Sequence, residues 1–101
     1  MAIETVFRVL GEPNRVKMVM LLGEKDCTVD QLRNRLGISQ SSTSQHLKML
    51  LRAGLATYSI HGNFRIYSLR TNELKKAMRF FDKFWDDGLK KMKAKLESKN
   101  E

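Results

Sequence analysis

Five polar side chains share one face of a predicted helix in the middle of the chain. At about 100° per residue, these are Ser41, Ser44, Gln45, Lys48 and Arg52. Ser and Gln side chains hydrogen-bond to base edges in a DNA major groove, whereas Lys and Arg meet phosphates. Gln45 has the two-pronged amide that pairs with an adenine. Taken alone, such a face also fits a helix that is merely solvated, so the elements around it must be considered.

Two short helices joined by a sharp turn would position this face. Thr28 and Gln31 form a capping-box pattern, which predicts a helix that begins at the residue after Thr28. Gly37 is expected to end that helix, because glycine adopts the left-handed conformation at little cost. Ser39 can then cap a second helix. The inward stripes of the two helices are predicted to consist of Val29, Leu32 and Leu36, and of Thr43, Leu47, Leu50 and Leu51.

After the second helix the pattern changes period. Residues 57–60 and 64–69 are rich in β-branched and aromatic side chains, which indicates two strands, and Gly62 supplies the positive φ angle of a hairpin turn. Because a lone hairpin is marginal in water, it must pack on the helices. His61 and Arg65 near its tip could lie over a phosphate backbone or enter a minor groove. The alternative is an exposed turn whose charge is incidental.

Two further helices are predicted before this region. The first should end at Leu10 and be closed by Gly11, and Pro13 occupies a position where helices commonly begin. The second helix should extend to Gly23, and its predicted inward residues are Val16, Val19, Met20 and Leu22.

From Asn72 onward the chain reads as one long helix, capped by Asn72 and with Glu73 in its first turn. Apolar residues recur at steps of four and three, which is typical of a seam for a partner helix. Such a helix would extend about 40 Å, longer than the rest of the domain is wide, so dimerisation is favoured over folding back. Gly88 predicts a close helix approach or a kink. The predicted dimer interface consists of Ile3, Phe7, Leu74, Met78, Phe81, Trp85, Leu89 and Met92.

Composition narrows the possible functions. The 101 residues suit a single domain with 42% hydrophobic residues, and no apolar run approaches the roughly 20 residues that span a bilayer. The beginning of the chain lacks the basic residues of an export signal, so a cytoplasmic protein is expected. A net charge of +8 favours a polyanionic partner, with an acidic membrane surface as a weaker candidate. We find no nucleophile with a nearby base and no phosphate-cradling glycine loop, so an enzyme is not expected.

Cys27 directly precedes the capping box. As the only cysteine it cannot form a disulfide within the chain, and the cysteine pair of a typical metal site is missing. A small, half-buried apolar role is favoured for Cys27, although a redox or metal-binding thiol is the alternative.

The order of these motifs carries a resemblance. A leucine-glycine-acid-proline-x-arginine opening at 10–15, the polar run at 39–48 and the Gly62 hairpin follow one another within residues 3–70. In these features the chain resembles the ArsR/SmtB family of winged helix-turn-helix transcriptional repressors. The resemblance implies a mainly α fold with a small β-hairpin (α+β) and a long C-terminal dimerisation helix. It divides the single domain, residues 1–101, into dimerisation helices at 1–11 and 72–97, a helix-turn-helix at 28–54 and a wing at 57–69.

The resemblance to this family also implies a function in DNA binding. The resemblance implies a homodimer that places one recognition helix per subunit in the major groove of a palindromic operator. His46 is expected to brace its helix against the core and not to contact DNA. The residues expected to contact DNA are Gln40, Ser41, Ser44, Gln45, Lys48, His61, Asn63 and Arg65.

The chain departs from the metal sensors of this family. Many members bind metal through a cysteine-x-cysteine motif that enters the third helix, but Thr28 and Asp30 stand at those positions. Other members use histidine ligands on the last helix, where this chain has no histidine. The segment 80–89 instead resembles a branch whose last helix carries a Phe-Trp pair. No metal and no cofactor are therefore expected, and the inducer is not indicated.

The sequence thus predicts a dimeric, DNA-binding repressor that acts without catalysis. Two alternatives stay open. In one, the protein is a metal- or thiol-responsive repressor that uses Cys27, which requires an exposed thiol. In the other, the winged helix is a module that binds protein instead of DNA.

Overall fold

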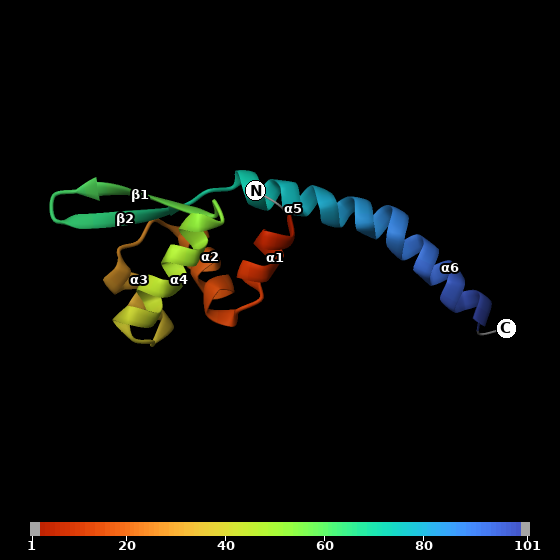
Figure 1. The fold of residues 1–101 in the computed structure, drawn as a ribbon, viewed down its shortest axis with the longest axis horizontal. Helices are drawn as coiled ribbons and strands as arrows, with labels where there is room; N and C mark the ends of the chain where they lie inside the picture. Colours follow the sequence, from red (N-terminus) through yellow and green to blue (C-terminus); the bar gives the residue numbers. More distant parts are fainter. Residues whose placement is uncertain (1–2, 100–101) are drawn as a thin grey trace.

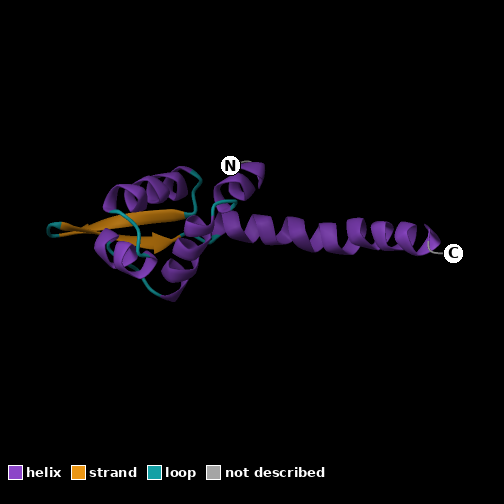
Figure 2. Ribbon diagram, turned by 90° about the horizontal axis from the view of Figure 1, so that it is seen from below, coloured by secondary structure: helices purple, strands orange, loops and turns teal. Residues whose placement is uncertain are grey.

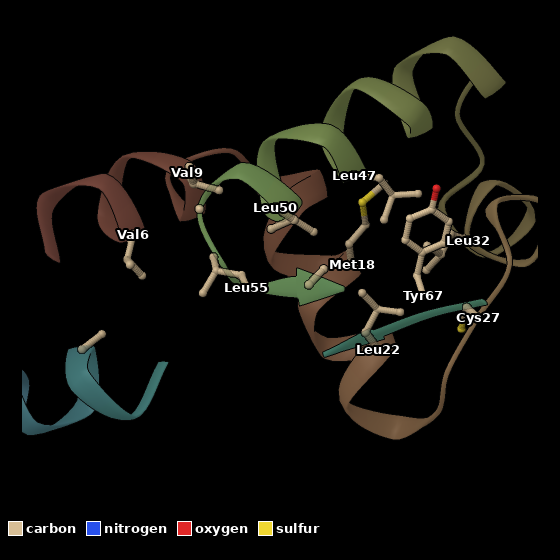
Figure 3. Packing of buried hydrophobic residues seen from close by; sticks show 13 residues of the cluster. Val6, Val9, Met18, Leu22, Cys27, Leu32, Leu47, Leu50, Leu55 and Tyr67 are labelled. Carbon is tan, nitrogen blue, oxygen red and sulfur yellow. The ribbon is translucent and has the colours of Figure 1, made fainter. Parts of the chain in front are cut away.

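Helices pack around a two-stranded hairpin in a computed structural model that describes residues 3–99 (Figure 1). The core contains Met18, Leu32, Leu47, Leu50 and Leu55, each no more than 2% exposed (Figure 3). This arrangement confirms the predicted α+β winged helix-turn-helix with a long terminal helix. The elements are α1 (Ile3–Leu10), α2 (Pro13–Glu24), α3 (Val29–Leu36), α4 (Gln40–Arg52), β1 (Ala56–His61), β2 (Phe64–Leu69), α5 (Asn72–Lys83), the π-helical segment η1 (Phe84–Leu89) and α6 (Lys90–Lys99).

Local hydrogen bonds fix α3 and α4 as predicted. The backbone N–H of Thr28 donates to Gln31 Oε1 at 2.9 Å, and the Gln31 N–H donates to Thr28 Oγ1 at 3.2 Å, which completes the capping box. Gly37 ends α3 with a φ of +67°, in the left-handed region. Ser39 Oγ accepts from the Ser42 N–H at 3.1 Å and caps α4. These bonds fix where α4 begins and therefore which of its residues face outward.

The hairpin pairs β1 and β2 in an antiparallel register from Ala56 opposite Leu69 to His61 opposite Phe64. Gly62 has the expected positive φ of +62° in a two-residue turn. At the other end, the Cys27 N–H donates to the Tyr67 carbonyl at 3.0 Å and the Tyr67 N–H donates back at 2.8 Å. The wing is therefore fastened to the segment that leads into α3.

The inward face of α2 differs from the prediction. Met18 and Leu22 are buried, whereas Val16 and Met20, predicted to point inward, are 38% and 66% exposed. The error has a physical cause. Apolar residues stand almost all around the second half of this helix, so their spacing does not single out one face. The helix also continues through Gly23 to Glu24.

The terminal helix begins and bends differently from the prediction. Thr71 occupies the cap position without a side-chain hydrogen bond, so the assignment of Asn72 as the cap was wrong, although Glu73 does lie in the first turn. Gly88 lies in η1, where a β-carbon would approach the Phe84 ring to 3.1 Å. The predicted irregularity at Gly88 is thus a π-helical turn, and glycine makes room there for an aromatic ring.

The terminal helix projects away from the rest of the molecule (Figure 2). The chain measures 64 × 25 × 21 Å and has a radius of gyration of 17.5 Å, compared with about 13 Å for a compact domain of this length. At its base, α5 packs on α1, where the Phe7 ring lies 5.8 Å from Phe80 and 5.1 Å from Phe81 between ring centroids. Within residues 3–99, no helix is both long and apolar enough to cross a membrane.

Two methionines on α2 test its corrected orientation. Met18→Ala removes a fully buried side chain and should lower the free energy of unfolding by about 2–5 kcal/mol. Met20→Ala removes a side chain that is 66% exposed and should stay within about 0.5 kcal/mol of the parent. Urea denaturation measures both, at one protein concentration because association contributes to apparent stability. Equal losses in the two variants would contradict this orientation.

Candidate nucleic-acid interface

The polar face of α4 lies on the molecular surface. Thr43, Leu47 and Leu50 are buried against the core, and Thr43 Oγ1 also donates to the Ser39 carbonyl at 2.8 Å. Because this inner face anchors the helix, the opposite face has to be presented to solvent. The predicted contact residues on α4 are all exposed, namely Gln40, Ser41, Ser44, Gln45 and Lys48, as is Arg52.

The wing presents its polar residues at the far end of the hairpin. His61, Asn63 and Arg65 are exposed. The Arg65 guanidinium carbon lies 4.7 Å from the centroid of the Tyr58 ring, a cation–π contact that holds the long side chain in place. This contact reduces the conformational entropy that Arg65 would lose on meeting a phosphate.

A groove brings part of the predicted site together. It joins the beginnings of α3 and α4 to the wing, has a volume of about 280 Å³, and is lined by Thr28, Val29, Asp30, Gln40, Asn63, Phe64 and Arg65. Gln40, Asn63 and Arg65 were predicted from separate motifs, and in the structure all three line this one groove. Ser41, Ser44 and Gln45 do not line it, so the helix face and the wing form two adjoining parts of one surface.

Two apolar residues of the wing were missed in the sequence. Ile60 is 69% exposed and Phe64 is 62% exposed, near the Gly62 turn. The hairpin extends beyond the helices that could cover them (Figure 1). Apolar side chains at such a tip are a known means of packing into a DNA minor groove.

Charge is distributed unevenly along the chain, a second feature that the sequence reading overlooked. Between Asp30 and Glu73 there is no carboxylate, whereas the same stretch contains six Lys and Arg residues. This stretch includes all of α4 and the wing. Since α4 and the wing carry no acidic side chains of their own, their exposed faces do not repel phosphates, although Asp30 of α3 lines the groove beside them.

His46 braces α4 against α2, as predicted. Its Nδ1 lies 3.4 Å from Arg15 Nη1, and its Nε2 lies 3.7 Å from Glu12 Oε2. Arg15 can only donate, so Nδ1 accepts and the ring proton resides on Nε2, facing the Glu12 carboxylate. Arg15 Nε also donates to the Val9 carbonyl. The cluster thus ties the end of α1 and the beginning of α2 to the middle of α4.

Cys27 lies inside the protein and is 5% exposed. Burial raises the pKa of the Cys27 thiol, although the nearby Lys25 and Arg35 partly offset that rise. The thiol donates to the Lys25 carbonyl at 3.3 Å. A thiol switch needs an exposed, easily ionised cysteine, so this geometry is unfavourable for the alternative in which Cys27 is a sensor. In the described part of the chain, no three His, Cys, Asp or Glu residues are grouped as a metal site would require.

The predicted dimer residues divide into two groups. Ile3, Phe7 and Leu74 already pack partly against the subunit's own core. Met78, Phe81, Trp85 and Met92 are at least half exposed, and Leu89 is half-buried. Beyond the predicted set, Phe80, Phe84 and Leu96 also present apolar surface. An apolar hollow of about 400 Å³ along η1 and α6 is lined by Trp85, Asp86, Leu89, Lys90, Met92, Lys93 and Leu96.

The Cys27 environment makes a prediction about thiol reactivity. Alkylation by iodoacetamide requires the thiolate, so burial and a raised pKa should make native Cys27 react far more slowly than the unfolded chain at pH 7 to 8. The dependence of the rate on pH should be displaced to higher pH, because a raised pKa delays ionisation. Mass spectrometry of labelled protein, with a guanidinium-unfolded control, measures both effects. Equal rates in the native and unfolded chains would restore the thiol-sensor hypothesis.

Comparison with known proteins places this geometry in context. Residues 12–58 match the family model described as bacterial regulatory protein, arsR family. The chain is 31% identical over 83 residues to the transcriptional repressor SdpR of Bacillus subtilis. The matched region covers 82% of this chain and 92% of that protein.

Solved structures give the same result. A possible transcriptional regulator for arsenical resistance is 39% identical and superposes with a TM-score of 0.73, covering 87% of this chain and 92% of the other. An ArsR-like transcriptional regulator from Rhodococcus sp. RHA1 is 25% identical and has a TM-score of 0.77 over 91% of this chain and 87% of the other. The chain therefore belongs to the ArsR family of bacterial regulatory proteins, which are DNA-binding winged helix-turn-helix transcription regulators and not enzymes.

Proposed function

We propose that this protein is a transcriptional repressor that binds a palindromic operator as a homodimer. The observation that carries the proposal is the division of α4 into a buried inner face and an outer face of short polar and basic side chains. A helix anchored in this way holds its outward side chains in a fixed position from which they can hydrogen-bond to base edges. Acting on DNA, the protein would work in the cytoplasm.

Each part of the surface has a role in this proposal. Gln40, Ser41, Ser44 and Gln45 read base edges, since their side chains lie in the first half of α4, which enters the major groove. Lys48 contacts the phosphate backbone. The wing residues His61, Asn63 and Arg65 lie against the backbone or minor groove of the flanking DNA.

Dimerisation is supported by the apolar surface of the terminal helix. Phe81, Trp85, Met92 and Leu96 are each more than half exposed along an element that projects from the domain. A monomer in water rarely exposes so much contiguous apolar surface. Pairing with the same surface of a second copy would bury it and would set two α4 helices on half-sites about 34–36 Å apart.

Repression follows from occupancy, since a dimer bound across a promoter excludes RNA polymerase. The printed name of the Bacillus subtilis relative, a transcriptional repressor, supports this sign of regulation. The net charge of +8 favours rapid association and an affinity that falls steeply with salt. The competing role, a winged helix that binds only protein, gives no reason for a carboxylate-free α4 and wing.

Operator selection tests the proposal and the role of Gln45 together. Genomic fragments retained by the protein should share a palindrome, and a reporter under the recovered promoter should rise when the gene is deleted. Gln45→Ala should then lose about 1–3 kcal/mol of discrimination at one base pair per half-site, because a two-pronged amide contact is removed. Fluorescence anisotropy on single-base operator variants measures this loss.

The control for Gln45→Ala is a substitution outside the polar face of α4. Met20→Ala, an exposed change on α2, should leave the base preference intact. Unchanged preference in Gln45→Ala would contradict its assignment to a base. Retention of no common sequence would favour the protein-binding module, and a reporter that falls on deletion would make the protein an activator.

The terminal helix makes a prediction about assembly. Trp85→Glu places a charge in the exposed apolar surface, and the dimer should dissociate to monomers, because an unpaired charge resists burial. Lys83→Glu introduces the same residue at an exposed position two residues before Trp85, about 200° away around the helix at about 100° per residue, and should leave the dimer intact. Sedimentation equilibrium measures both, and circular dichroism should show retained helix. A dimeric Trp85→Glu protein would refute this interface.

A further inference from the structure

We propose that the hollow between α2 and α4 is a binding site for one backbone phosphate of the DNA, beside the base pair that Gln45 reads. This inference rests on the proposed function and adds a specific ligand group to it. The two helices are in contact (Figure 1), and the hollow between them has a volume of about 280 Å³. Its lining is Arg15, Gln45, His46, Lys48, Met49 and Arg52.

The position of the hollow follows from the size of the helix and the groove. An α-helix with its side chains is about 10–12 Å across, close to the roughly 12 Å width of the major groove. When α4 lies in that groove, the phosphates of the two strands therefore pass along its two flanks. The groove shared with the wing reaches α4 only at Gln40, where the helix begins, whereas the hollow against α2 runs beside the middle and end of α4. Gln45 belongs both to the outer face and to the rim of this hollow.

The charge of the hollow suits a phosphodiester. Arg15, Lys48 and Arg52 supply three permanent or near-permanent cations. The Glu12 carboxylate accepts from the backbone N–H of Arg15 at 3.1 Å and lies 3.7 Å from His46 Nε2. Among residues 3–99, the ion pairs of the structure do not include Lys48 or Arg52. Two cations at the rim are thus available to an incoming anion.

Arg15 forms a preorganised floor. Its Nε donates to the Val9 carbonyl and its Nη1 lies 3.4 Å from His46 Nδ1, so contacts to α1 and α4 hold the guanidinium. A fixed guanidinium loses little conformational entropy on meeting a phosphate oxygen. Lys48 and Arg52 are exposed and can close over the same group. The site therefore has a rigid cation beneath and two movable cations above.

The first test counts the ions released on binding. The double variant Lys48→Gln/Arg52→Gln should lower the magnitude of the slope of log K against log salt by up to about 0.9, the value for one phosphate contact, and not by twice that value, because both cations serve the same phosphate. Lys17→Gln removes an exposed cation of α2 outside the hollow and should leave the slope unchanged. Anisotropy titrations on the selected operator from 50 to 200 mM salt, on the order of the range where such slopes are resolved, give all three values.

The second test locates the phosphate. A single neutral methylphosphonate is moved through the operator backbone, and one position next to the Gln45 base pair should weaken the wild-type protein markedly. The double variant Lys48→Gln/Arg52→Gln should lose much less affinity than the wild type at that position, while both proteins respond alike to methylphosphonates elsewhere.

The outcomes separate the two levels of the proposal. If the double variant Lys48→Gln/Arg52→Gln keeps the wild-type slope, or if it loses as much affinity as the wild type at every methylphosphonate position, the phosphate site is refuted while operator binding stands. If the wild-type protein selects no operator, the proposed function and this site fail together. Melting temperatures of the variants identify any loss that comes from unfolding.

Discussion

The structure depends on the burial of one face of α4. Thr43, Leu47 and Leu50 are at most 2% exposed, and they pack where α2, α3 and the first strand of the hairpin converge. A helix held along one side cannot rotate without exposing leucines, which would cost about 2–3 kcal/mol each. The direction of Ser41, Ser44 and Gln45 is therefore set by hydrophobic packing on the far side of the helix. The core therefore decides which side chains of α4 face outward.

Polar contacts add to this constraint where the end of α1 and the beginning of α2 contact the middle of α4. Arg15 donates to the carbonyl of Val9 at the end of α1 and faces His46 in the middle of α4, and Glu12, the N-cap of α2, lies 3.7 Å from His46. Since α1 also packs on α5 through Phe7, a short chain of contacts connects the base of the terminal helix with α4. The spacing of two reading helices in a dimer would be only as exact as this connection is stiff.

Local signals in the sequence predicted much of this fold. The Thr28–Gln31 capping box and the positive φ angles at Gly37 and Gly62 depend on residues a few positions apart, and all are present. Features set by distant partners were missed. Met18 is buried because of what α2 packs against, the contact of Arg65 with Tyr58 joins two strands, and the hollow beside Gln45 exists only where α2 meets α4. The residue types of the site could be predicted, but not their grouping.

The π-helical turn bears on how the terminal helix could pair. The apolar residues Phe81, Trp85 and Leu89 are separated by two successive steps of four, and each step of four overshoots a full α-helical turn by about 40°. In a strictly α-helical rod the seam would therefore wind away from a partner. A π-helical turn uses hydrogen bonds five residues apart and so contains more residues per turn. The step from Trp85 to Leu89 therefore falls short of a full turn and brings Leu89 back toward the line of Phe81. Gly88 permits this turn because the Phe84 ring occupies the space where a β-carbon would stand. Gly88, which interrupts the apolar pattern in the sequence, thus lies within the turn that keeps this pattern on one side of the helix.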